Sequence, residues 1–201
     1  LKIGNPVSIP VIPKQEDLEL INKGYNPEPK SLYEEEINED FVVLTQLPEY
    51  NKDPSYLDET TRDEFILKNK LKFLRPYQLN ALKAIQESAK NGNDRFLLEM
   101  ATGTGKTLTS CAIMKMFLRS SNVKRVLFLV DRLELESQAY KQFTDVLKND
   151  YITSVWKENK SDWRKAKIVV STIQSLKSNN RYKKDFKRDD FDLVISDESH
   201  R

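Results

Sequence analysis

The chain has 201 residues, of which 38% are hydrophobic and 32% are charged, and its formal net charge is +2. This length suits one sizeable domain with an appendage, or two small domains. No stretch approaches the roughly 18–20 uninterrupted apolar residues of a membrane span, so no membrane segment is expected. A single cysteine, Cys111, excludes an internal disulfide and favours a reducing cytoplasm. The chain also has only one histidine, so its soft ligands are too few for a zinc site, whereas its carboxylates could hold magnesium.

Charge is distributed unevenly along the chain. Residues 1–60 hold five lysines, no arginine and thirteen acidic residues, a net charge of −8, and the remainder carries +10. The basic part is therefore the candidate for phosphate-rich partners, with a solvated surface of mixed charge as the alternative.

Residues 1–70 have the composition of a connector. Seven of the eight prolines fall here, with an acidic run at Glu34–Glu36. Two short helices are expected, Gln15–Asn22 and Leu57–Asn69, the second with Ser55 or Asp58 as its cap. Because the chain opens on Leu1 rather than methionine, we expect it to be a fragment.

From residue 71 onward, short apolar runs alternate with segments of helical periodicity. Runs of successive aliphatic or aromatic residues suit strands that are buried on both faces. The predicted strands are Arg95–Met100, Arg125–Val130, Tyr151–Val155, Lys167–Ser171 and Asp192–Ser196, and the predicted helices are Pro76–Lys90, Thr107–Arg119 and Leu133–Lys148. This alternation predicts an α/β domain whose parallel sheet is covered by helices on both faces.

The strongest motif is MATGTGKT at residues 100–107, between a predicted strand and a helix. Gly103 and Gly105 allow the backbone N–H groups to converge on phosphate oxygens at the positive end of the following helix. Lys106 would then reach the β- and γ-phosphates of ATP, and the Thr107 hydroxyl would bind Mg²⁺. The motif departs from the phosphate-loop pattern at Met100, where glycine is usual.

A second motif, Asp197-Glu198-Ser199-His200, directly follows the last predicted strand. Carboxylates at the carboxyl end of a parallel strand lie at the edge where open α/β sheets bind ligands. Asp197 would hold Mg²⁺, and Glu198 would orient and deprotonate the attacking water. A helix cap or solvated charge is the alternative for two adjacent acids.

Together the two motifs resemble motifs I and II of the superfamily 2 helicases and translocases in the DExH form, which implies a RecA-like phosphate-loop domain. RPYQ at residues 75–78 is similar to that family's glutamine motif, so Gln78 is expected to contact adenine. An exposed glutamine in the first turn of a helix is the alternative. His200 is expected to couple the nucleotide and nucleic-acid sites, or else to lie on the surface. The resemblance implies nucleotide binding by Arg75, Gln78, Thr102, Gly103, Thr104, Gly105, Lys106, Thr107 and His200.

Two further segments, VDRL at residues 130–133 and STIQS at residues 171–175, resemble the family's nucleic-acid contacts. The resemblance implies backbone contacts from Arg132, Thr172 and Gln174, which position DNA without reading its sequence. Arg132 and Thr172 are alternatively simple helix-start residues.

Whole phrases, including LLEMATGTGKTLTS and DLVISDESHR, resemble the motor subunit of type I restriction enzymes. This implies a connector at residues 1–70, from a nuclease domain that is absent here, and a first RecA-like domain at residues 71–201. The expected activity is hydrolysis of Mg-ATP to move double-stranded DNA before cleavage, in the cytoplasm, with modification and specificity subunits as partners. The fragment alone is expected to be inactive, because the second RecA-like domain and its arginine finger are missing. The alternatives are a helicase of DNA repair or RNA metabolism, and a nucleotide-gated binding module without turnover.

Several other residues admit two interpretations. Trp156 and Trp163 suit packing against the sheet better than stacking on bases. The stretch at residues 181–188 is either a phosphate contact or a solvated turn. No catalytic motif accompanies Cys111 in the sequence, so this residue is expected in the core.

Overall fold

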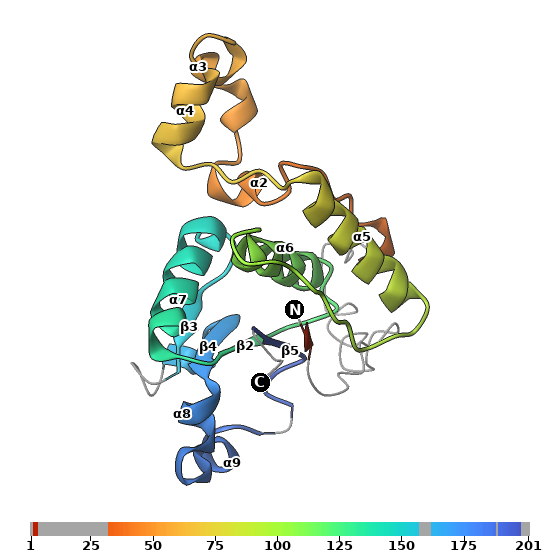
Figure 1. The fold of residues 1–201 in the computed structure, drawn as a ribbon, viewed down its shortest axis with the longest axis vertical. Helices are drawn as coiled ribbons and strands as arrows, with labels where there is room; N and C mark the ends of the chain where they lie inside the picture. Colours follow the sequence, from red (N-terminus) through yellow and green to blue (C-terminus); the bar gives the residue numbers. More distant parts are fainter. Residues whose placement is uncertain (1, 4–31, 157–161, 188, 198–201) are drawn as a thin grey trace, which may run out of the picture.

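The structure is a computed structural model that describes residues 2–3, 32–156, 162–187 and 189–197 (Figure 1). Its α-helices are α2 (Val43–Gln46), α3 (Pro54–Leu57), α4 (Arg62–Asn69), α5 (Pro76–Lys90), α6 (Lys106–Arg119), α7 (Leu133–Leu147), α8 (Ile173–Lys177) and α9 (Arg181–Asp185). Its strands are β1 (Lys2–Ile3), β2 (Val126–Val130), β3 (Thr153–Val155), β4 (Ile168–Thr172) and β5 (Leu193–Ser196). The three long helices and four of the strands agree with the sequence prediction to within two residues at each end.

The strands form one sheet in the order β1-β5-β2-β4-β3. Strand β2 pairs in parallel with β4 and β5, β3 pairs in parallel with β4, and only β1 is antiparallel. The predicted α/β class with a parallel sheet is therefore confirmed, and the architecture is that expected of a RecA-like helicase domain.

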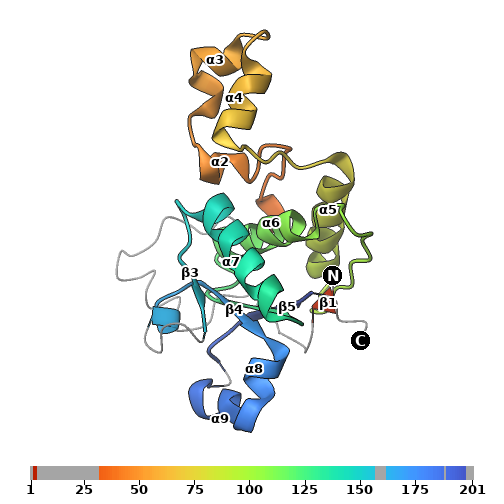
Figure 2. The same cartoon turned by 60° about the vertical axis from the view of Figure 1, so that its left-hand side comes forward.

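Alternate residues of the strands pack on opposite faces of the sheet. From β2, Val126, Phe128 and Val130 join the core beneath α6 and α7, whereas Leu127 joins a second cluster on the other face. Figures 1 and 2 show α6 and α7 on one side of the sheet and α8 and α9 on the other. Successive apolar residues are thus buried because both faces are covered, as the sequence predicted.

The second cluster contains both tryptophans of the chain. Trp156 and Trp163 are 5% and 2% exposed, and both rings contact Phe186 at centroid distances of 5.4 and 5.0 Å. The guanidinium of Arg125 lies 5.4 Å from the Trp163 ring centroid and donates to the carbonyls of Trp163 and Ala166. Both tryptophans are therefore core residues, which confirms packing as their role.

Helix α6 is buried all round, not on one face only. Every residue from Leu108 to Leu118 is buried, including Lys115, because Leu32, Phe41 and Val42 cover the side of the helix that faces away from the sheet. Part of the predicted connector thus packs into the same core as the sheet.

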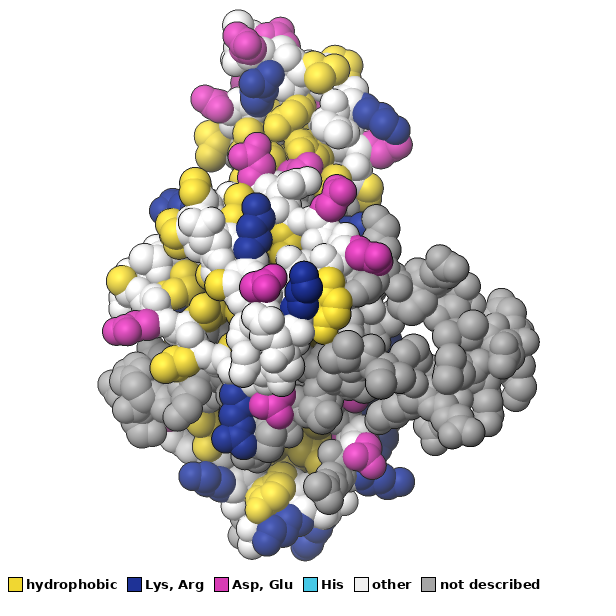
Figure 3. Space-filling model, turned by 90° about the vertical axis from the view of Figure 1, so that its right-hand side faces the viewer, with side chains coloured by type: hydrophobic (Ala, Val, Ile, Leu, Met, Phe, Trp, Pro, Cys, Tyr) yellow, Lys and Arg dark blue, Asp and Glu magenta, His cyan; other side chains and the backbone are white. Residues whose placement is uncertain are grey.

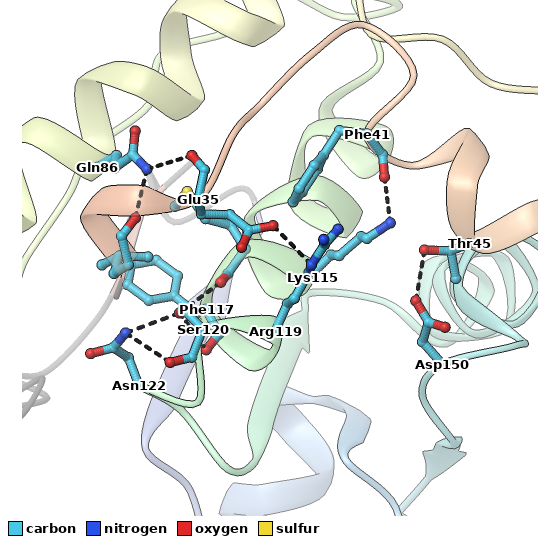
Figure 4. Close-up of polar contacts among 12 residues, drawn as sticks. Glu35, Phe41, Thr45, Gln86, Lys115, Phe117, Arg119, Ser120, Asn122 and Asp150 are labelled. Atoms are coloured by element: carbon cyan, nitrogen blue, oxygen red, sulfur yellow. Dashed lines mark hydrogen bonds and ion pairs between the residues drawn. The ribbon is translucent and has the colours of Figure 1, made fainter. Parts of the chain in front are cut away.

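Polar contacts hold this covering segment in place (Figure 4). The Lys115 ammonium donates to the Phe41 carbonyl, and the Arg119 Nε lies 3.0 Å from a carboxylate oxygen of buried Glu35. From α5, the Gln86 side chain donates to the carbonyls of Leu32 at 2.6 Å and Glu35 at 3.0 Å. The segment is therefore tied to both helices that flank the candidate loop at residues 100–105.

Burial lowers the pKa of Lys115 from 10.5 to about 8, although Asp150, Glu35 and Asp40 partly oppose this by favouring the charged form. Between these two pKa values the unfolded chain binds more protons than the folded one, so the free energy of unfolding should increase as pH rises. We predict that the free energy of unfolding of the parent increases by about 1 kcal/mol more than that of Lys115→Met between about pH 7.5 and 9. Urea unfolding at both pH values measures this difference.

The comparison with Lys115→Met removes other titrations from the result. Burial raises the pKa of the Cys111 thiol, which lowers stability above about pH 9, but this group is present in both proteins. Parallel pH profiles for parent and variant would contradict the prediction.

Residues 43–74 form a small helical unit above the sheet domain (Figure 1). Its own cluster contains Val43, Tyr50 and Leu71, and Tyr50 contacts Tyr56 edge to face at 4.7 Å. The Tyr50 hydroxyl donates to Asp40 at 2.8 Å, and burial together with this carboxylate raises the pKa of Tyr50.

Two sequence predictions of elements were wrong. Leu57–Asn69 is not one helix, because the Asp53 side chain caps the short α3, Asp58 accepts from the Thr60 N–H in the turn that follows, and α4 begins only at Arg62. Arg95–Met100 is not a strand but a segment with one isolated bridge at Leu97, in which Phe96 is buried and Leu98 and Met100 are half-buried. The predicted helix Gln15–Asn22 lies outside the described residues.

Candidate nucleotide site

The loop before α6 turns on two glycines. Gly103 and Gly105 have φ angles of 78° and 80°, a region that side chains with a β-carbon rarely adopt. Thr104 lies between them, and its hydroxyl donates to the Ala101 carbonyl at 2.6 Å. A Cβ on Gly103 would meet no atom within 4 Å and would point into open space beside the loop. The chain therefore turns tightly through two positive φ angles, the kind of backbone that a phosphate-binding loop requires.

Helix α6 begins directly at the end of this loop. Lys106 and Thr107 are its first two residues and are half-buried, whereas Thr102 is exposed. The start of the helix thus combines an ammonium, a hydroxyl and the unpaired N–H groups of a first helical turn. This donor set fits the phosphates of a nucleotide and one ligand position of Mg²⁺.

Helix α5 clamps the loop from the side. The Tyr77 hydroxyl donates to the Thr104 carbonyl at 2.7 Å. The Gln78 amide nitrogen donates to the Gly105 carbonyl at 3.2 Å and to the Thr109 hydroxyl at 3.1 Å. The predicted glutamine motif and phosphate loop are therefore in direct contact.

Gln78 is not an exposed glutamine, since it is only 1% exposed. Its amide oxygen accepts from the Arg75 N–H at 2.9 Å, so both ends of the amide are paired within the protein. Arg75 itself is exposed at the N-cap of α5. Contact of either residue with adenine stays a prediction, and the observed role of Gln78 is to join α5 to the loop.

The carboxyl ends of three strands meet at one edge of the sheet. Leu129 is paired with Ser196 and Val130 with Thr172, so Asp197 follows β5 beside Val130, and Asp131 lies one residue further along. The Asp197 N–H donates to the Leu129 carbonyl at 2.9 Å.

The loop reaches this same edge. Six residues separate the end of α6 at Arg119 from the start of β2 at Val126, so α6 runs back along the sheet and its first turn lies toward the carboxyl ends of the strands. The topology therefore places the loop and Asp197 at the same edge of the sheet, where the parallel strands end. Glu198 and His200 lie outside the described residues.

The three predicted DNA contacts differ in exposure. Arg132 at the N-cap of α7 is exposed, with its Nε 3.9 Å from an Asp131 oxygen, and Gln174 in α8 is also exposed. Thr172 is 1% exposed and caps α8, where its hydroxyl accepts from the Ser175 N–H at 3.1 Å. The geometry of Thr172 is thus that of a helix-start residue.

The sequence did not reveal every residue of this region. Tyr77 and Thr109 complete the contact between α5 and the loop, and the buried Glu136 accepts from the Thr172 N–H at 2.9 Å. These partners lie 27 to 36 residues apart, so no local pattern marks them. Within the described ranges, no group of three or more acidic, histidine or cysteine side chains is arranged to hold a metal, and no helix is long and apolar enough to cross a membrane.

Comparison with known families decides the relationship. Residues 71–201 match the family described as type III restriction enzyme, res subunit. The chain belongs to this family. The matched range begins just before α5 and includes the loop, the four parallel strands and Asp197.

Individual relatives carry the names of type I restriction enzymes. The chain is 37% identical over 139 residues to the EcoKI endonuclease subunit of Escherichia coli strain K12, and 37% identical over 134 residues to the EcoAI endonuclease subunit of Escherichia coli. It is 32% identical over 141 residues to the SsaAORF53P endonuclease subunit of Staphylococcus saprophyticus. These alignments cover 63–66% of this chain and 12–16% of the relatives. The predicted resemblance to the endonuclease subunit of type I restriction enzymes is therefore confirmed.

Proposed function

We propose that residues 71–201 are the first RecA-like motor domain of a type I restriction enzyme, with residues 1–70 as a connector to a nuclease domain. The domain binds and hydrolyses Mg-ATP to move double-stranded DNA, in the cytoplasm and in complex with modification and specificity subunits. The observation that carries the proposal is the loop of Gly103 and Gly105 at the start of α6, clamped by Tyr77 and Gln78 from α5.

Four of the predicted site residues carry the chemistry in this proposal. Lys106 stabilises negative charge on the transferred phosphoryl group, and Thr107 and Asp197 hold the metal. Glu198 orients the attacking water as a general base. When bound, Mg²⁺ supplies charge neutralisation at the phosphates.

DNA is held by sequence-independent contacts at the carboxyl edge of the sheet. Arg132 and Gln174 would contact the DNA backbone there, and both side chains are exposed, which supports this role. The Thr172 hydroxyl is engaged in capping α8, so its contribution is to fix the start of the helix that presents Gln174.

Phosphate release by the full-length protein tests the proposal, measured with and without duplex DNA. We expect DNA to stimulate ATP hydrolysis, and movement along DNA to require ATP. Absence of ATP hydrolysis both with and without DNA would favour the nucleotide-gated module, and stimulation by RNA alone would favour a helicase of RNA metabolism.

A smaller effect is predicted for Tyr77→Phe, which removes the hydroxyl that donates to the Thr104 carbonyl but keeps the ring. Loss of one such hydrogen bond corresponds to about 0.5–1.5 kcal/mol, so ATP should bind about 2- to 13-fold more weakly. Titration with ATP measures the affinity. Tyr182→Phe, at an exposed tyrosine in α9, is the matched control and should leave the affinity unchanged.

A further inference from the structure

A basic groove lies between α7 and the turn that follows α4. It has a volume of about 700 Å³ and is lined by Lys70, Lys72, Lys141 and Lys148, by amide side chains, by one carboxylate, Asp145, and by the apolar Leu47, Leu71 and Val146. Figure 2 shows the C-terminal end of α7 beneath α2 and the end of α4. This is the opposite end of α7 from Arg132, so the groove is separate from the predicted DNA contacts at the strand ends.

The two walls of the groove are fixed to one another through α2. The Gln46 amide donates to the Lys70 carbonyl at 3.2 Å and accepts from the Lys72 N–H at 2.9 Å. On the other side, Asn149 at the end of α7 donates to the carbonyls of Thr45 at 2.6 Å and Gln46 at 3.1 Å. The groove is therefore formed before any ligand arrives.

The four ammonium groups of the groove are not neutralised within the described part of the chain. None of them has a carboxylate within 4.0 Å there, and all four lysines are exposed. Lys141 and Lys148 are seven residues apart, so they lie on one side of α7 at a spacing of about 10.5 Å. Lys70 has a φ angle of 52°, where glycine would be less strained.

We propose that this groove binds the phosphodiester backbone of DNA, an inference that rests on the proposed DNA translocation. Lysine ammonium groups and amide N–H groups are donors that suit phosphate oxygens. None of the described residues that line the groove is aromatic, so they offer no platform for stacking bases, and lysine contacts to phosphate do not read sequence. Its volume admits the edge of one strand rather than a whole duplex. A second contact distant from the strand ends would hold DNA while the motor moves.

Salt dependence of DNA binding by the full-length protein tests the groove. Each lost phosphate contact reduces the slope of log K against log [salt] by about 0.9, so Lys141→Gln with Lys148→Gln should reduce it by about 1.8. Between about 50 and 200 mM salt the parent should then lose about tenfold more affinity than the variant. The matched control is Lys83→Gln with Lys90→Gln, which removes two exposed lysines at the same spacing from α5 and should keep the parent slope.

Lys70→Gly separates binding from folding. It removes a third ammonium but relieves the positive φ angle, so we expect weaker DNA binding with no fall in melting temperature. If the α7 double variant has the same slope of log K against log [salt] as the parent, the proposal that the groove binds DNA is wrong, and the proposed function is unaffected. A parent protein that binds no DNA at any salt concentration would overturn both.

Discussion

Lys106→Ala is expected to reduce ATP hydrolysis by the full-length protein at least about 100-fold. Lys106 is the first residue of α6, directly after Gly105, where its ammonium can follow the phosphoryl group during transfer. Removal of one preorganised donor from developing charge costs about 10²–10³ in rate, and here a full positive charge is lost as well. Phosphate release at saturating ATP measures the change.

The same variant should bind DNA in the absence of ATP within about twofold of the parent, because Lys106 is not proposed to contact DNA. Loss of one phosphate contact would change the slope of log K against log [salt] by about 0.9, and no such change is expected. Lys83→Ala, an exposed lysine on α5, controls for the loss of a surface charge and should keep parent activity. Retention of near-parent hydrolysis by Lys106→Ala would remove the loop from the catalytic site.

The sheet and its long helices could be predicted from local patterns. Runs such as VLFLV in β2 are apolar at successive positions because both faces of a parallel sheet are covered. Helix α5 has the predicted bounds because Pro76 suits a first helical position and Asn91-Gly92 ends the helix. These signals lie within a few residues of the elements that they specify.

The covering of α6 could not be predicted in this way. Lys115 lies in the middle of α6, and a lysine at such a position is expected to reach water rather than to be buried. In the structure Phe41, from a segment with connector-like composition, covers Lys115 and supplies the carbonyl that accepts from it. Only a contact across 74 residues reveals this, and periodicity carries no such information.

In the candidate site, too, some features could be predicted from local sequence and others could not. The glycine pattern predicted the turn and the start of α6, and the strand ends predicted the edge where Asp197 lies. The pairing of Gln78 was not foreseen, because an amide with good chemistry for adenine is here committed to the Arg75 N–H, the Gly105 carbonyl and the Thr109 hydroxyl. Residue type indicates what a side chain can bind, whereas burial determines which partner it reaches.

Gly105→Ala is expected to lower the free energy of unfolding by about 2–4 kcal/mol and to weaken ATP binding. A left-handed backbone costs an alanine about 1–2 kcal/mol, and Gly105 has a φ angle of 80°. A Cβ would also lie 2.9 Å from the Gln78 amide nitrogen. Gln78 can withdraw only by giving up its bonds to the Gly105 carbonyl and the Thr109 hydroxyl, each of about 1 kcal/mol.

Two controls separate the backbone effect from the clash. Gly92 has a φ angle of 84° but no atom within 4 Å of a Cβ, so Gly92→Ala should cost only about 1–2 kcal/mol. In a Gln78→Ala background the clash is absent, and Gly105→Ala should then cost the same as Gly92→Ala. Urea unfolding of the single and double variants gives the coupling energy, expected at about 1–2 kcal/mol. Additive costs would mean that Gln78 does not press on the loop, and the clamp from α5 would then rest on Tyr77 alone.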